Sequence, residues 1–202
     1  SGYIQETGDT DGTGAKYTKI HVERSVRFLR GHHGAFLLRE DELASIQKMI
    51  LCTGLSVRTD TMEFSSQEEL YAGLILGTAD LLGQMSDRTY LEKLLFLYYE
   101  FREAGIDGYN TEFDIIHKTV DFYELTKKRL AEENRGVYRY ARDHFRERRG
   151  IDRNLYMEAI DRHISYLHRI IADDSSNFRK KLKRAPWVEH YQGAGTEETL
   201  AP

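Results

Sequence analysis

Residues 65–85, SSQEELYAGLILGTADLLGQM, decide the fold class of this chain. Ser65 stands three residues before Glu68, and Ser66 three before Glu69. Both spacings are those of a capping box, in which a serine and a glutamate satisfy the first free amide groups of a helix. The stretch therefore predicts one long helix that begins at Ser65 or Ser66 and contains the most apolar part of the chain. Its small residues would let a second helix come close: Gly73, Gly77 and Ala79.

The rest of the chain shows the same helical periodicity, interrupted by glycine-containing turns. Residues 1–16 hold four glycines and three acids without periodicity, which indicates a loop. We expect further helices over residues 17–30, 40–53, 89–104, 112–118, 120–134 and 137–148, and a long one after Asp152. Residues 174–202 are expected to form a polar tail with a basic cluster at 179–184. No segment reads as a strand, so the expected fold is all-α with about seven helices.

Composition excludes several classes of protein. The chain has 202 residues, of which 40% are hydrophobic and 31% charged, and a formal net charge of −4. That apolar content can fill a core, and the charge does not favour nucleic acid or an anionic membrane as a partner. No apolar run of roughly 18 residues exists to span a membrane. The single cysteine, Cys52, excludes an internal disulfide and has the apolar neighbours of a small buried residue, so we expect a cytoplasmic protein.

Asp80 is the most informative polar residue, because it stands in the most apolar part of the chain. On a helix its neighbours three and four residues away include no cation: Leu76, Gly77, Gly83 and Gln84. A buried carboxylate without a partner is costly, so this one must be protonated, hydrogen-bonded or bound to a cation from elsewhere in the fold. Two interpretations remain open. Asp80 is either a structural carboxylate that caps a helix or pairs with a distant arginine, or a metal ligand.

Three histidines are further candidates. His21 lies one position beside the apolar stripe of its helix, where a histidine is either a half-buried structural residue or a functional one. His32 and His33 are flanked by glycines, which is typical of a surface loop. None of them forms a sequential zinc motif, since the chain has no HExxH and no two histidines four residues apart.

Residues 126–150 form a basic stretch, with nine lysines and arginines against four acids. Four of the arginines are spaced as one helical face and are candidates for binding a substrate phosphate: Arg135, Arg139, Arg142 and Arg146. The alternative is a solvated face, on which the nearby acids offset the positive charge.

The order of these segments resembles that of a known protein family. An acidic, glycine-rich loop is followed by a helix that begins HVERSVRFL (21–29), a helix that ends KMILCTGLS (48–56), and the helix GLILGTADLLGQM (73–85). In this order the chain resembles the later part of an HD-superfamily metal-dependent phosphohydrolase of the phosphodiesterase-like type. The resemblance implies an HD-like helical bundle over residues 1–125, incomplete at its N-terminus, and a C-terminal helical extension with a polar tail over 126–202.

The resemblance also implies a hydrolase with a metal site. Proteins of that family bind one or two divalent metals through a histidine, a His-Asp dyad and a distant helical aspartate. Asp80 matches that aspartate, and His21 matches a helix-start histidine that some members use as a further ligand or as an acid near the phosphate. The cofactor would be Mn, Fe, Mg or Zn, and the substrate a small phosphoester such as a nucleotide or cyclic nucleotide. No His-Asp dipeptide occurs here, so we expect the chain to begin just after the dyad and to hold an incomplete site.

A non-catalytic helical module for signalling or assembly is the alternative function. Such a module would associate with itself, as a homodimer, along the apolar stripe of the last long helix at Tyr156, Ile160 and Leu167. Burial of these side chains within one chain would count against it.

Overall fold

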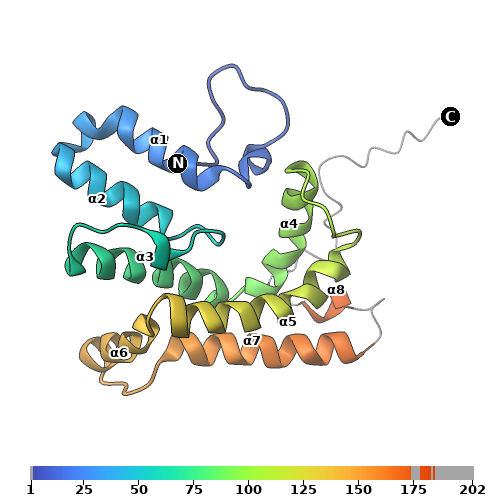
Figure 1. The fold of residues 1–202 in the computed structure, drawn as a ribbon. Coiled ribbons are helices and arrows are strands. Elements are labelled where there is room, and N and C mark those ends of the chain that lie inside the picture. Colours follow the sequence, from blue (N-terminus) through green and yellow to red (C-terminus); the bar gives the residue numbers. More distant parts are fainter. Residues whose placement is uncertain (1, 174–177, 183, 185–202) are drawn as a thin grey trace.

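The computed structural model describes residues 2–173, 178–182 and 184, and within these ranges the protein is all-α, as predicted (Figure 1). Its α-helices are α1 (His21–His32), α2 (Glu40–Leu51), α3 (Gln67–Ser86), α4 (Tyr90–Glu103), α5 (Glu112–Lys128), α6 (Ala141–Arg149), α7 (Leu155–Ala172) and α8 (Phe178–Lys181). Short 3-10 helices are η1 (Gly14–Tyr17), η2 (His33–Phe36), η3 (Thr59–Thr61) and η5 (Val137–Tyr140), and η4 (Arg129–Glu133) is a π-helical turn.

The main apolar core joins α3, α4, α5 and α7. Its fully buried members include Met85, Leu95, Ile116 and Leu167, one from each of these helices. In Figure 1, α5 and α7 run side by side, and α4 rises from them at a steep angle. The boundary expected at 125/126 falls inside α5, and core residues lie on both sides of it. The described residues therefore share one core across that boundary.

The helix α3 begins where the sequence predicts. Ser66 is its N-cap residue, and the Ser66 hydroxyl oxygen accepts a hydrogen bond from the Glu69 N–H at 3.2 Å. The Glu69 carboxylate in turn accepts the N–H of Ser65 and lies 3.2 Å from the Lys48 ammonium. These contacts hold the start of α3 against α2.

The predicted close approach of a second helix to α3 is confirmed. A β-carbon added at Gly77 would lie 2.5 Å from the Cys52 carbonyl oxygen, and one at Gly73 would lie 2.8 Å from the Cys52 Sγ. Cys52 follows the last residue of α2 and is 1% exposed, as expected for a small buried residue. Glycine is therefore needed where the end of α2 crosses α3.

We predict that Gly77→Ala lowers the free energy of unfolding by about 1–3 kcal/mol, because the new β-carbon must push α2 away from α3. Gly83→Ala is the matched control, since a β-carbon there meets no atom within 4 Å and alanine favours the helix. Urea unfolding of both variants measures the difference. Equal stability of the two would contradict the close approach.

Three expectations about helix boundaries were wrong. The helix expected over residues 17–30 is α1, which begins at His21 and continues through Gly31 to His32. Residues 112–118 and 120–134 do not form separate helices: α5 is continuous from Glu112 to Lys128, because no glycine or proline interrupts it. The expected helix over 137–148 is divided into η5 and α6. Just before it, Arg135 (φ 51°) and Gly136 (φ 70°) adopt left-handed backbone conformations, which end the helix that precedes them.

The expectation that the apolar stripe of the last long helix is a surface for self-association is also wrong. Ile160 is 1% exposed and Leu167 is 0% exposed, because both face the core of their own chain. The expected polar tail lies largely outside the described residues. Its described part forms α8, followed by the buried Leu182, and the Arg179 guanidinium pairs with the carboxylate of Glu112.

The structure also bears on membranes. None of the described helices is both long enough and apolar enough to cross a bilayer.

Candidate functional site

A cavity of about 1100 Å³ opens between the N-terminal segment and the helices α3, α4 and α5. The start of α1 and the loop 53–57 after α2 complete its walls. Polar groups from several of these elements face it: Tyr3, Lys19, His21, Asp80, Gln84, Glu100 and Lys118. The two candidate ligands proposed from the sequence, His21 and Asp80, thus line the same cavity.

His21 is the first residue of α1 and is half-buried in the cavity wall. Its Nδ1 atom lies 2.7 Å from the carbonyl oxygen of Thr18, which can only accept a hydrogen bond, so Nδ1 carries the proton. In the neutral ring Nε2 then keeps its lone pair, the form in which an imidazole accepts a proton or binds a metal. The ring of Tyr3 stacks on this imidazole, with centroids 4.7 Å apart, and fixes its plane.

Asp80 lines the cavity from α3, but it is half-buried and not buried as its apolar neighbours in the sequence predicted. Its Oδ1 accepts a hydrogen bond from Gln84 Nε2 at 3.0 Å, one helical turn away. Among the described residues no arginine or lysine pairs with this carboxylate, so the expected alternative of a distant arginine partner is not met there. The remaining lone pairs of Asp80 are available to a ligand in the cavity.

Glu100 is a third acidic group in the cavity, and the sequence patterns did not single it out. It lies on α4, is half-buried, and has no hydrogen-bond or ion-pair partner among the residues that the structure describes. Burial raises the pKa of the Glu100 carboxyl, and repulsion from Glu103 raises it further. The pKa of the Tyr3 phenol is raised by burial and by the nearby charges of Glu100 and Asp80, although a hydrogen bond with Thr18 opposes the rise.

Replacing Glu100 tests this unfavourable charge. A carboxyl whose pKa is raised by folding stabilises the fold while it is protonated, and that contribution is lost as the pH rises through the folded-state value. We therefore predict that Glu100→Gln raises Tm at pH 7 and has little effect below about pH 4, where both side chains are neutral. Glu147→Gln, on the exposed surface of α6, is the control. A lower Tm for Glu100→Gln at pH 7 would count against the assignment.

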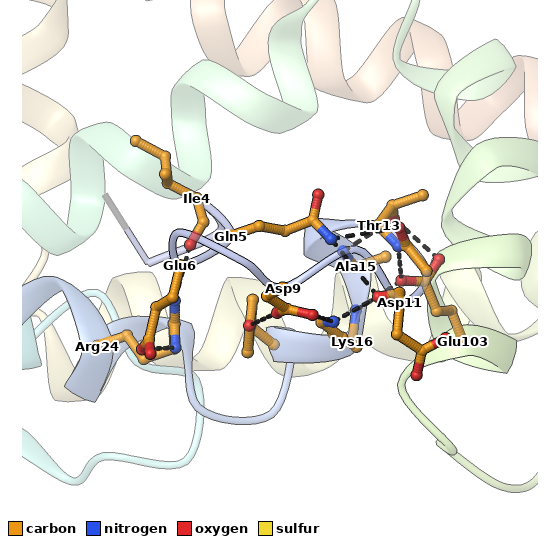
Figure 2. A network of polar contacts seen from close by, with 12 residues as sticks. Ile4, Gln5, Glu6, Asp9, Asp11, Thr13, Ala15, Lys16, Arg24 and Glu103 are labelled. Atoms are coloured by element: carbon orange, nitrogen blue, oxygen red, sulfur yellow. Dashed lines mark hydrogen bonds and ion pairs between the residues drawn. The ribbon is translucent and has the colours of Figure 1, made fainter.

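A network of polar contacts fastens the N-terminal segment to α1 and α4 (Figure 2). The Glu103 carboxylate, at the end of α4, accepts the Thr13 N–H at 2.5 Å and the Lys16 N–H at 3.2 Å. On the other side, the Arg24 guanidinium donates to the carbonyl oxygens of Gly2 at 2.9 Å and of Ile4 at 2.7 Å. The segment is therefore attached to both α4 and α1, and this holds Tyr3 against His21.

Metal-ligating side chains are sparse. Within the described ranges no group of three or more histidine, cysteine, aspartate or glutamate side chains is close enough to hold a metal ion. His21 and Asp80 provide donors of suitable chemistry but are not a complete set on their own.

Comparison with protein families assigns the chain to one family. The model of one family, described as Npun_R2479-like, matches residues 6–158. The chain belongs to the Npun_R2479-like family. The matched segment contains every residue that lines the cavity except Tyr3. No curated protein and no solved structure matches the chain.

The other sequence candidates of this Npun_R2479-like protein lie outside the cavity. His32 ends α1 and His33 begins η2, so they do not lie in the expected loop, and the Nδ1 atom of each contacts a backbone carbonyl oxygen of α1. The four arginines expected on one helical face do not share one, because the left-handed backbone at 135–136 precedes η5 and α6. Arg142 and Arg146 instead pair with Asp152, so the structure does not bring this group to the cavity.

A buried arginine positions one wall of the cavity. In the sequence it is only one of the cations of the basic stretch 126–150. Arg129 is 7% exposed and lies in the π-helical turn η4. Its guanidinium donates to the carbonyl oxygens of Gly54 at 2.9 Å and of Leu55 at 2.8 Å, and more weakly to those of Cys52 and Val57 at 3.3 Å. These bonds hold the loop 53–57, which lines the cavity.

Proposed function

We propose that this protein hydrolyses a phosphoester with the help of a divalent metal ion held at His21 and Asp80. The observation that supports the proposal is that these two residues, far apart in the sequence, line one cavity. The resemblance of the α1, α2 and α3 segments to HD-type phosphohydrolases points to the same pair.

The donors fit a metal in their chemistry. A carboxylate and a neutral imidazole together suit Mn, Fe or Zn. The Thr18 carbonyl fixes the His21 ring so that Nε2 is the free nitrogen, and such backbone contacts are the usual support of a metal-binding histidine. Two donors do not complete a coordination sphere, so we propose that the substrate and water supply the rest.

The chemistry requires a positive charge, because the negative oxygens of a phosphoester repel a nucleophile. A divalent cation would offset that charge and activate water near neutral pH. The chain's own contribution is orientation, because Asp80 and His21 would hold the cation. The Tyr3 phenol, whose ring stacks on His21 at the cavity, would donate a hydrogen bond to a phosphate oxygen.

A metal-dependent assay tests the proposal. The protein is treated with a chelator, dialysed and assayed with bis-p-nitrophenyl phosphate, before and after Mn²⁺ is restored. We expect turnover that the chelator abolishes and Mn²⁺ restores. Turnover that survives chelation, or no turnover with any of Mn²⁺, Fe²⁺, Mg²⁺ and Zn²⁺, would contradict metal-dependent phosphoester hydrolysis and favour a non-catalytic helical module.

A further inference from the structure

The cavity wall formed by α4 and α5 carries a row of apolar side chains, with the Glu100 carboxyl beside them. From α4, four residues spaced as one helical face line it: Tyr90, Leu94, Leu97 and Phe101. Ile115 and Phe122 continue this surface on α5. Tyr90, Leu94 and Ile115 are buried, whereas Leu97, Phe101 and Phe122 are only half-buried and present apolar surface to the cavity.

Two polar groups of this wall, Thr119 and Lys118, make their contacts within the protein, whereas the Glu100 carboxyl has no partner among the described residues. The Thr119 hydroxyl donates to the Ile115 carbonyl oxygen at 2.7 Å. The Lys118 ammonium donates to the Gly108 carbonyl oxygen and lies over the Tyr109 ring, 4.6 Å from its centroid. A nucleobase or sugar placed here would lose its hydrogen bonds to water and regain few, which is costly. An apolar group would lose nothing and would cover exposed apolar side chains.

We propose that the phosphoester taken by this cavity carries an apolar group, alkyl or aryl, that lies against the α4–α5 wall while its phosphate faces Asp80 and His21. This inference rests on the proposed function for the phosphate end of the ligand. The cavity, at about 1100 Å³, has room for far more than a phosphate group. The cavity has apolar side chains on one wall and donors for a cation on another. It therefore suits a ligand with an apolar part and an anionic end.

Calorimetric binding of a homologous series tests the inference without catalysis. Methyl-, butyl-, hexyl- and octylphosphonate, which have no ester bond to hydrolyse, are titrated into the protein with Mn²⁺ present. Kd should fall about fourfold for each added CH₂ group until the wall is covered. Hexylphosphonate should bind more tightly than adenosine monophosphate, which has the same kind of anionic end and a polar remainder.

Variants of the wall give the second measurement. Leu97→Gln and Phe122→Gln should each weaken the dependence on chain length. Leu125→Gln is the matched control, because Leu125 lies on α5 three residues after Phe122 but is 68% exposed and outside the cavity. Circular dichroism checks that each variant folds, and if Phe122→Gln does not fold, Leu97→Gln decides.

The outcomes separate this inference from the proposed function. Equal affinity along the series, tighter binding of adenosine monophosphate, or no binding of any phosphonate would overturn the apolar ligand. A dimer that Leu97→Gln dissociates would also overturn it, because the wall would then be an interface. Chain-length dependence in a protein that hydrolyses no phosphoester would refute the proposed function but support the apolar ligand.

Discussion

Arg129→Met should lower the free energy of unfolding by about 3–5 kcal/mol, because it removes the donors of several buried carbonyl oxygens at once. The guanidinium makes its shortest hydrogen bonds, 2.8 and 2.9 Å, to the carbonyl oxygens of Leu55 and Gly54. Methionine fills a similar volume but donates nothing, so these oxygens would be left without partners or would draw water into the core. The loop 53–57 would then lose its position beside the cavity.

Two further variants make the Arg129 measurement specific. Arg129→Lys should recover only part of the lost free energy of unfolding, because a compact ammonium cannot reach all the carbonyl oxygens that a planar guanidinium contacts. Arg139→Met should cost little, because Arg139 is exposed. Urea unfolding at neutral pH provides all three values. A loss below about 1 kcal/mol for Arg129→Met would show that the loop does not depend on this residue.

Asp80→Asn should reduce metal-dependent turnover by at least about 100-fold. Loss of a group that only supports a metal ligand already costs about 10–100-fold, so loss of the ligand's charge should cost no less. The substitution is mild for the fold, because the asparagine carbonyl oxygen can still accept the Gln84 hydrogen bond. The expected loss is therefore one of metal binding and not of folding.

The control for Asp80→Asn is Asp121→Asn, which makes the same chemical change on the exposed surface of α5. We expect that variant to keep full turnover. Metal content, turnover and Tm are measured on the same preparations. Unchanged turnover in Asp80→Asn, or an equal loss in both variants, would remove Asp80 from the site.

Local signals in the sequence predicted much of the helical framework. The capping serine and glutamate before α3 place its start at Ser66, and the small residues Gly73 and Gly77 predict the crossing with α2. These features act between neighbouring residues or on one helix face, so a single sequence contains them. The predicted break within α5 was wrong, because residues 112–128 contain no glycine or proline that would interrupt a helix.

The residues that the sequence did not reveal depend on distant contacts. Arg129 looks like one cation in a basic stretch, although its position beside Leu130 and three residues after the buried Thr126 places it on the core face of the chain. Glu100 lies three residues after Leu97 on the cavity face of α4, but only the folded structure shows that no described residue pairs with its carboxylate. The prediction of one arginine face was wrong for a different reason. The four arginines have helical spacing in the sequence, but the left-handed backbone at 135–136 keeps them from lying on one helix.

Nitrogen-15 NMR of the histidine rings during Zn²⁺ titration tests most directly whether His21 and Asp80 share a cation. We predict that the Nε2 resonance of His21 shifts on metal addition while Nδ1 stays protonated against the Thr18 carbonyl. We also predict that Asp80→Asn abolishes the shift but Asp121→Asn does not. A His21 resonance that ignores Zn²⁺, or one that shifts equally in Asp80→Asn, would contradict a cation shared by the two residues.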